Sequence, residues 1–111
     1  MYDGQEAVAV GNQAGLDEKE DAFMGAYRIH GHAYVRGFSV HEIIAEMMGK
    51  YTGGSEGKGG SMHYYKKENQ FYGGHGLVGD QVSCVVGIGF AKKYLGHGGV
   101  AIGSFGDGAC N

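Results

Sequence analysis

Glycine constrains this chain more than any other residue, because it occupies 24 of 111 positions and 18 of those lie from Gly49 onward. Ordinary proteins contain about 7% glycine, and each glycine increases the conformational entropy that folding must overcome. The chain has no proline and no Gly-X-Y period, so a collagen triple helix is excluded. We therefore predict helices in the first half and, in the second half, loops whose backbone closely approaches a neighbour.

Composition and charge narrow the class of protein. Hydrophobic residues make up 42% of the chain, with 8 tyrosines and 5 phenylalanines among them, which argues against a disordered chain. A net charge of −3, with Arg28 and Arg36 as the sole arginines, argues against a nucleic-acid partner. No apolar run reaches the roughly 18 residues of a membrane span, so we expect no membrane insertion. Cys84 and Cys110 form no CxxC pair, which argues against a disulfide scaffold.

Three segments have helical patterns. Residues 6–15 are rich in alanine and valine, and we expect a buried helix there. Ser39 and Glu42 form a capping-box pattern that begins a helix over residues 40–48, and Gly49 suits its end. An apolar stripe with helical spacing, predicted to lie in the core with its methionines, consists of Val40, Ile43, Ile44, Met47 and Met48. Residues 81–95 form the third expected helix, packed closely against its neighbours.

Residues 99–105 are short, apolar and flanked by glycine, which is typical of a buried strand in a parallel sheet. Helices followed by such a strand indicate part of an α/β fold, with helices around a parallel sheet. No internal repeat interrupts this order, and 111 residues make at most one ordinary domain.

Two glycine-rich segments invite a nucleotide-binding interpretation, and both fail: the first matches a known pattern by letters but not by context, and the second does not match by letters. Residues 74–79 read Gly-x-Gly-x-x-Gly, but residues 67–72 before them are polar, so no buried strand is expected there. No acidic residue lies about 20 positions further on, where a dinucleotide-binding fold places one. Lys58 is followed by glycine rather than serine or threonine, so it is no P-loop lysine.

Several polar residues are candidates for chemistry. None of the six histidines has a zinc-type spacing, but His30, His63 and His75 lie in segments that we expect to be loops, where functional residues are common. Asp107 lies between two glycines after the expected strand, where α/β folds bind ligands, and its carboxylate is a natural magnesium ligand. On these three letters alone, a tight turn with a helix-capping aspartate remains the alternative.

Six blocks in order give the sequence a specific resemblance: Asp-Gly-Gln-Glu-Ala (3–7), Ala-Tyr-Arg-x-His-Gly (26–31), Arg-Gly-x-Ser-Val (36–40), Gly-Lys-Gly-Gly-Ser-Met-His (57–63), Phe-Tyr-Gly-Gly-His-Gly-Leu-Val-Gly (71–79) and Gly-Asp-Gly-Ala (106–109). Together they resemble the alpha subunits of the pyruvate dehydrogenase decarboxylating component, in the thiamine-diphosphate-dependent 2-oxo acid dehydrogenase family. The resemblance covers essentially all 111 residues. It implies that residues 1–111 are the N-terminal and central part of an incomplete thiamine-diphosphate-binding domain.

The resemblance implies that two segments bind thiamine diphosphate itself. Tyr27 and Arg28 match the tyrosine–arginine pair that meets the diphosphate of thiamine diphosphate. Gly76 and Val78 match the segment that touches the aminopyrimidine through backbone atoms.

The resemblance also implies a magnesium site near the end of the chain. Asp107 matches the Mg²⁺ ligand, and Gly108 and Ala109 match the turn whose backbone supports the diphosphate. His63 lies in the family's Ser-Met-His loop near the site, with no role assigned. Catalytic residues in this chain stay unassigned. The resemblance implies that the glutamate that activates the aminopyrimidine comes from the beta subunit, so we expect this chain to be inactive alone.

The implied activity is oxidative decarboxylation of pyruvate, with transfer of the acetyl unit to a lipoyl group. The implied partners are a beta subunit, in a heterotetramer, and the lipoyl acyltransferase component. The implied compartment is the mitochondrial matrix, with the bacterial cytoplasm as the alternative. Two other functions stay open: an alpha subunit acting on branched-chain 2-oxo acids or acetoin, and a truncated, non-catalytic remnant.

The sequence also departs from the family. It stops at Asn111, before the downstream asparagine and tyrosine that complete the magnesium shell, so we expect a fragment of a longer subunit that is inactive alone. Residues 83–86, Ser-Cys-Val-Val, stand where the family usually has a Pro-Leu-Gly type turn. Asp80 and residues 12–13 also differ from the commoner residues.

Overall fold

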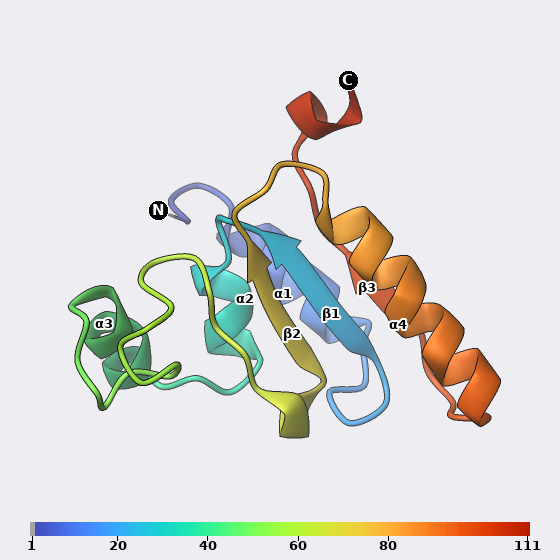
Figure 1. Cartoon of the computed structure of the whole chain (residues 1–111), viewed down its shortest axis with the longest axis horizontal. Coiled ribbons are helices and arrows are strands. Elements are labelled where there is room, and N and C mark those ends of the chain that lie inside the picture. Colours follow the sequence, from blue (N-terminus) through green and yellow to red (C-terminus); the bar gives the residue numbers. More distant parts are fainter. Residues whose placement is uncertain (1) are drawn as a thin grey trace.

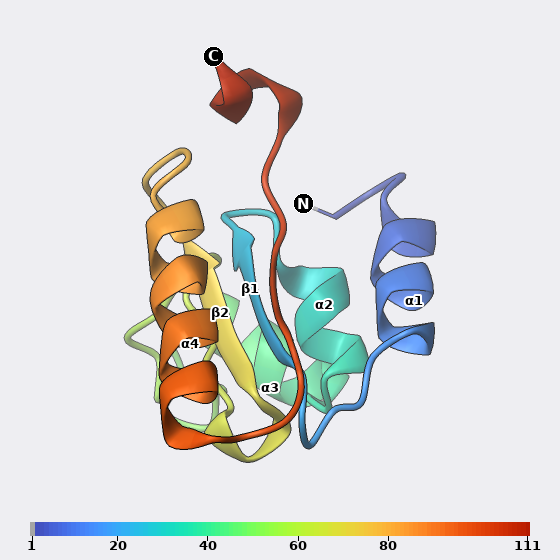
Figure 2. The same cartoon turned by 90° about the vertical axis from the view of Figure 1, so that its right-hand side faces the viewer.

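A three-stranded parallel sheet lies at the centre of the molecule, between helices on its two faces (Figures 1 and 2). The computed structural model describes residues 2–111. The strands are β1 (Ala22–Ala26), β2 (Phe71–His75) and β3 (Ala101–Gly103), in the order β2-β1-β3. Both pairings of β1 are parallel. The prediction of an α/β fold with helices around a parallel sheet is confirmed.

In residues 2–111, four α-helices and two short 3-10 turns precede, connect or follow the strands. Their bounds are α1 (Glu6–Ala14), α2 (His30–Val35), α3 (Val40–Met47), α4 (Gln81–Leu95), η1 (Lys67–Asn69) and η2 (Asp107–Cys110). Figure 2 shows α4 against one face of the sheet and α1 and α2 on the other side. The three predicted helices are therefore confirmed as α1, α3 and α4. The predicted strand at residues 99–105 is confirmed as β3, but it is shorter than expected and half-buried rather than buried. No helix in residues 2–111 has both the length and the apolar character needed to cross a bilayer.

Two strands contradict the sequence-based expectations. The first half is not all helical, because β1 is the central strand of the sheet. The segment before the Gly-x-Gly-x-x-Gly motif does enter a buried strand, because Phe71 begins β2 with no exposed surface. The glycines in these strands permit close packing: a Cβ at Gly25 would collide with the Ile29 side chain, and one at Gly74 would lie 2.9 Å from the Ala26 carbonyl oxygen.

The capping of α3 follows the prediction. The Glu42 N–H donates to Ser39 Oγ at 3.1 Å, and the Ser39 N–H donates to Glu42 Oε2 at 2.6 Å. Gly49 ends the helix with φ +66°, a conformation that favours glycine.

The apolar stripe of α3, however, does not lie in the core. Of its five residues, Ile43 alone is buried, and Met48 keeps 66% of its surface exposed. Figure 1 shows that α3 lies at one end of the molecule, and of the stripe Ile43 alone joins the core. The helix instead turns Glu46, which is fully buried, toward the glycine-rich loop that follows it.

The core is an aromatic and aliphatic cluster between the sheet and the helices α2 and α3. It contains Phe23, Ile29, Ala33, Phe38, Ile43, Tyr64 and Phe71. The Phe23 and Phe71 rings stack at 6.2 Å, so the core joins β1 and β2 directly. Tyr64 donates its hydroxyl proton to the Ile43 carbonyl at 3.2 Å, which satisfies its polar end.

Helices α1 and α4 contribute less to this core than predicted. In α1, Ala9 is buried while Val8 and Val10 are exposed, so the expectation of a buried helix is wrong. Helix α4 packs against β3, where a Cβ at Gly103 would lie 2.9 Å from Val85 Cγ2. Its opposite side carries an exposed row of apolar residues at four-residue spacing: Val82, Val86, Phe90 and Tyr94.

Candidate functional site

All three strands end at the same edge of the sheet, because all three run parallel. The sequence-predicted site residues follow these ends. Tyr27 and Arg28 come directly after β1, residues 76–78 after β2, and Asp107 four residues after β3. Ligands of open α/β folds bind beyond the carboxyl ends of strands. The topology therefore brings segments up to 80 residues apart in sequence to one edge (Asp107 − Tyr27, 107 − 27 = 80).

A cavity of about 420 Å³ lies at this edge. Its lining comes from the N-terminal segment and from the turns after β1 and β3: Tyr2, Gln5, Val8, Ala26, Tyr27, Arg28, Ser104, Phe105, Gly106 and Asp107. Three of the seven predicted cofactor-binding residues, Tyr27, Arg28 and Asp107, therefore share one cavity. Within the described chain, Gly76, Val78, Gly108 and Ala109 are not part of its lining.

The other four predicted residues lie beside the cavity in two adjacent turns. Ala109 N–H donates to the Gly106 carbonyl at 3.0 Å, which closes the turn η2 around Asp107 and Gly108. The Ala109 carbonyl oxygen lies 3.6 Å from the position that a Cβ would take at Gly79. The turn after β3 thus lies against the turn that holds Gly76 and Val78.

A buried glutamine positions the segment that leads to Asp107. Gln81, at the start of α4, has no exposed surface and donates from Nε2 to the Ser104 carbonyl at 3.3 Å. The Ser104 N–H donates to the Met24 carbonyl of β1 at 3.0 Å. Ser104 is therefore held from both sides, and sequence reasoning assigned Gln81 no such role.

Arg28 and Asp107 carry opposite charges into the same cavity. The Arg28 guanidinium lies 5.8 Å from the centre of the Tyr27 ring, a cation–π distance. Among residues 2–111, no hydrogen bond or ion pair engages the Arg28 guanidinium or the Asp107 carboxylate. Arg28 can therefore bind an anion and Asp107 a hard cation, and neither has to give up an existing partner in the described chain.

Neither backbone conformation nor packing requires glycine at the two positions that flank Asp107. Neither Gly106 nor Gly108 has a positive φ, and a Cβ at either position would meet nothing within 4 Å in the described chain. Side chains would therefore extend into open space beside Asp107. Glycine at both positions keeps this space free for a bound group and leaves the backbone accessible to it.

A second cavity, of about 270 Å³, lies on the other side of the Tyr27–Arg28 pair. Its lining comprises Tyr27, Arg28, His30, Met47, Ser61 and Met62. His30 begins helix α2 rather than lying in a loop, and both of its ring nitrogens are buried without a partner among the described residues. Burial lowers the pKa of His30 below its ordinary value, so the neutral ring can exchange hydrogen bonds with a bound group.

The wall of this second cavity depends on Glu46. Its carboxylate accepts the N–H groups of Ser55 at 2.7 Å, Gly57 at 2.9 Å and Gly59 at 2.6 Å. Burial alone raises the pKa of Glu46, but these backbone hydrogen bonds outweigh it, and the pKa lies below 4.5. The ionised carboxylate shapes the loop that leads directly to Ser61 and Met62.

His63, the third residue of the Ser-Met-His segment, is held to the sheet. Its Nδ1 lies 3.2 Å from the Gly74 carbonyl oxygen of β2, and its ring faces Gly76 at 3.8 Å from a Cβ placed there. The Gly-Lys-Gly-Gly-Ser-Met-His segment and the turn after β2 are thus neighbours in space, as well as parts of the same resemblance.

Comparison with known proteins gives consistent relatives. A model of the dehydrogenase E1 component family matches residues 1–111. The chain is 54% identical over 111 residues to the mitochondrial pyruvate dehydrogenase E1 component subunit alpha-1 of Arabidopsis thaliana, covering 100% of the chain and 28% of that relative. It is 50% identical over 111 residues to the pyruvate dehydrogenase E1 component subunit alpha of Rhizobium meliloti, covering 100% of the chain and 32% of the relative.

A fungal relative gives the same result. The mitochondrial pyruvate dehydrogenase E1 component subunit alpha of Schizosaccharomyces pombe is 49% identical over 108 residues, which cover 97% of the chain and 26% of that relative. The chain thus spans about a third or less of the length of these relatives.

Proposed function

The chain belongs to the dehydrogenase E1 component family, and from this premise we propose that it carries the diphosphate and magnesium end of a thiamine diphosphate site. The observation that carries the proposal is the cavity shared by Tyr27, Arg28 and Asp107. We further propose that residues 1–111 are part of a pyruvate dehydrogenase alpha subunit. Its activity is oxidative decarboxylation of pyruvate, with transfer of the acetyl unit to a lipoyl group.

The residues of the cavity fit such a group. Mg²⁺ prefers oxygen ligands and is commonly held by a carboxylate together with phosphate oxygens, and Asp107 offers a carboxylate without a competing partner in the described chain. Arg28 supplies planar N–H donors suited to a diphosphate. The open space beside Gly106 and Gly108 leaves the backbone N–H groups of η2 within reach.

Each residue then has a role that follows from its position. Arg28 and Tyr27 would hold the diphosphate, Asp107 would hold Mg²⁺, and the backbone of Gly108 and Ala109 would support the diphosphate from the turn η2. Gly76 and Val78, after β2, would present backbone groups to the aminopyrimidine. When bound, thiamine diphosphate supplies the electron sink that decarboxylation of a 2-oxo acid needs.

The partners and the compartment are part of the proposal. We propose a heterotetramer with a beta subunit that contributes the activating glutamate, so we expect no turnover from this chain alone. The lipoyl acyltransferase component would accept the acetyl unit. The plant and fission yeast relatives carry mitochondrial names and the Rhizobium meliloti relative does not. This supports the mitochondrial matrix, with the bacterial cytoplasm as the alternative.

The test measures magnesium-dependent binding of thiamine diphosphate by calorimetry, using the full chain co-expressed with a beta subunit of the family. We expect Asp107→Asn and Arg28→Gln each to weaken binding by more than about tenfold, a change of roughly 1.4 kcal/mol. Asp3→Asn is the matched control, because Asp3 is exposed and outside the cavity lining.

The same preparation separates the alternatives. Turnover of pyruvate above branched-chain 2-oxo acids and acetoin supports the proposed substrate, and the reverse order would favour the relatives that act on those compounds. If thiamine diphosphate does not bind in a magnesium-dependent manner in the presence of the beta subunit, the alternative of a non-catalytic remnant is favoured instead.

A further inference from the structure

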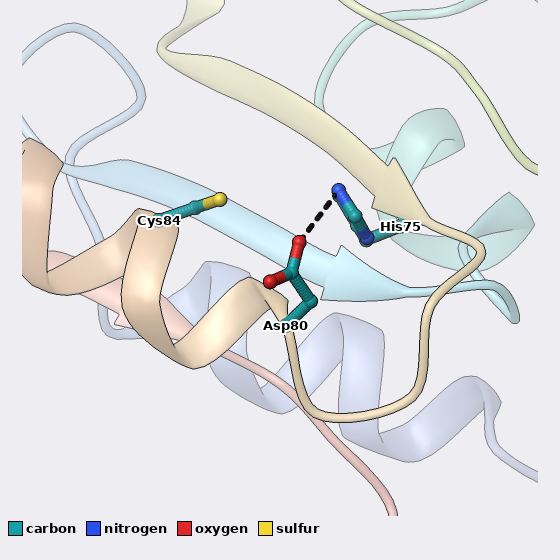
Figure 3. A group of neighbouring side chains, drawn as sticks. All are labelled: His75, Asp80 and Cys84. Atoms are coloured by element: carbon teal, nitrogen blue, oxygen red, sulfur yellow. Dashed lines mark ion pairs between the residues drawn. The ribbon is translucent and has the colours of Figure 1, made fainter.

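We propose that His75, Asp80 and Cys84 form a binding site for one divalent transition-metal ion of the zinc type. The metal-ligating atoms of these three side chains all lie within 4.8 Å of one another. His75 Nε2 is 3.2 Å from Asp80 Oδ2. Figure 3 shows the three side chains pointing toward one another, His75 from the end of β2 and the other two from the start of α4.

Local backbone geometry produces the cluster. Asp80 and Cys84 are four residues apart, and the Cys84 N–H donates to the Asp80 carbonyl at 3.4 Å, so one helical turn places both side chains on the same face. His75 is the last residue of β2, so the expectation that it lies in a loop is wrong. Gly79, with φ +86°, lets the chain turn sharply enough to bring α4 back to the end of that strand.

The ligand set selects the class of metal. Imidazole nitrogen, carboxylate oxygen and thiolate sulfur together suit Zn²⁺ and similar ions, whereas Mg²⁺ and Ca²⁺ prefer oxygen alone. The carboxylate and thiolate charges would neutralise the ion. Three protein ligands would leave a fourth tetrahedral position for water, which the solvent exposure of Asp80 would allow.

The distances are compatible with closure by side-chain rotation. Bonds of about 2.0–2.3 Å in a tetrahedral zinc site place its ligand atoms roughly 3.3–3.8 Å apart. His75 Nδ1 makes no hydrogen bond to the described residues, so no other partner resists a small rotation of the ring. Cys84 is a free thiol and is partly accessible.

The site differs from the proposed magnesium site in residues and in chemistry. None of its three residues lines the cavity that holds Arg28 and Asp107. A bound ion would link the end of β2 to the first turn of α4 and fix the intervening residues 76–79. This consequence for Gly76 and Val78 rests on the proposed function, whereas the metal site itself does not.

The test is a titration of the full 111-residue chain with Co²⁺, followed by displacement with Zn²⁺. Cobalt reports a thiolate ligand through sulfur-to-metal charge-transfer absorption and reports tetrahedral geometry through its visible bands. We expect saturation at one Co²⁺ per chain. Cys84→Ser should abolish the charge-transfer absorption, and His75→Gln and Asp80→Asn should each weaken binding by at least about tenfold.

Two control variants match the chemistry of the ligands. Cys110→Ser removes the other free thiol, which is exposed, and His97→Gln removes an exposed histidine. Both should titrate like the parent chain, and circular dichroism in EDTA should show the same secondary structure for every variant. If one ligand variant fails this check, the others decide the question, because each removes a different ligand.

Several results would overturn the site. They are charge-transfer absorption that persists in Cys84→Ser, loss of that absorption in Cys110→Ser, unchanged affinity in both His75→Gln and Asp80→Asn, or no saturable spectrum at all. Equal binding in concentrated urea would also overturn it, since the three ligands meet only in the folded chain. Each result is independent of thiamine diphosphate binding, so failure here leaves the proposed function untouched.

Discussion

Glu46 shows how a single buried charge can organise a flexible segment. The loop from residue 53 to residue 60 has five glycines among its eight residues, yet three of its N–H groups converge on one carboxylate. An ionised carboxylate that accepts several backbone N–H groups is stable in a buried position, because the hydrogen bonds replace its hydration. The sequence cannot reveal this role of Glu46, because its hydrogen-bond donors are backbone N–H groups, which every residue except proline has.

Glu46→Gln tests this role at the residue scale. The amide turns one acceptor into a donor that faces other donors, so we expect a loss of about 1.5–3 kcal/mol in the free energy of unfolding. Urea denaturation at pH 7 measures it. Glu56→Gln is the control, because Glu56 lies in an exposed ion pair with Lys58 whose loss should be nearly neutral.

The pH dependence of Glu46 has a defined sign. Its folded-state pKa lies below the ordinary 4.5, so its stabilisation is complete above pH 4.5 and is lost as the pH falls through the folded-state pKa. The difference between the parent chain and Glu46→Gln should therefore shrink in acid. A constant difference down to pH 3 would contradict this account.

His32 predicts a second pH dependence, in a different range. Its ring is buried and stacks on Phe23 at 4.1 Å. Burial, followed by the charge of Arg36, lowers the pKa of His32 from 6.5 to about 4. The unfolded chain takes up a proton first, so stability should fall as the pH drops from 6.5 to about 4, by on the order of 3 kcal/mol.

Thermal unfolding between pH 5 and pH 7.5 checks this prediction. His32→Phe keeps a ring of similar shape and should remove most of the pH slope, leaving a smaller part from His30, whose pKa burial also lowers. His97→Gln should retain the full slope, because His97 is exposed. An unchanged slope in His32→Phe would show that another group controls stability in this range.

At the scale of a single element, the contribution of the N-terminal cap of α3 to the free energy of unfolding can be measured directly. The reciprocal hydrogen bonds between Ser39 and Glu42 satisfy donors at the start of the helix. Ser39→Ala should lower the free energy of unfolding by about 1 kcal/mol. Ser83→Ala in the exposed part of α4 is the control and should be neutral or slightly stabilising, because alanine is the better helix former. If Ser83→Ala lowered the free energy of unfolding as much as Ser39→Ala does, the effect could not be attributed to the cap.

The helices were predictable where local signals exist, and two strands were not. The capping box and Gly49 gave α3 both of its ends, and α4 runs over the predicted residues 81–95. Strand β1 has five residues and β2 contains two adjacent glycines, so neither shows a period that separates a strand from a loop. These strands form because they pair with each other and bury Phe23 and Phe71, which is a tertiary effect.

Burial was the weakest part of the sequence-based prediction. Apolar residues of α3 and α4 have the spacing of buried faces, yet Met48 and Phe90 are 66% and 68% exposed. Periodicity predicts that one face of a helix is apolar, but it does not predict whether other residues of the same chain bury that face.

At the scale of the whole molecule, the parallel arrangement of the strands accounts for the candidate site. A short strand followed by Gly-Asp-Gly suggested a ligand edge without excluding a tight turn, and the resemblance supplied the roles of Asp107, Tyr27 and Arg28. The structure adds that Tyr27, Arg28 and Asp107 line one cavity. The roles of Gln81 and His30 could not be predicted, because they depend on contacts with segments distant in the sequence. The role of Glu46 could not be predicted because its donors are backbone N–H groups of the next loop.

The pairing of β1 with β3 also sets an order of events. Ala22 pairs with Ala101, a separation of 79 residues (101 − 22), whereas Phe23 pairs with Phe71 across 48 residues (71 − 23). Contacts between distant residues form late, because closing a longer loop costs more entropy. During synthesis, the ribosome releases β1, β2 and α4 before the strand that completes the edge. We therefore expect β3 to pair with β1 after β2 does, and a ligand held between Arg28 and Asp107 would hold β3 in place after it docks.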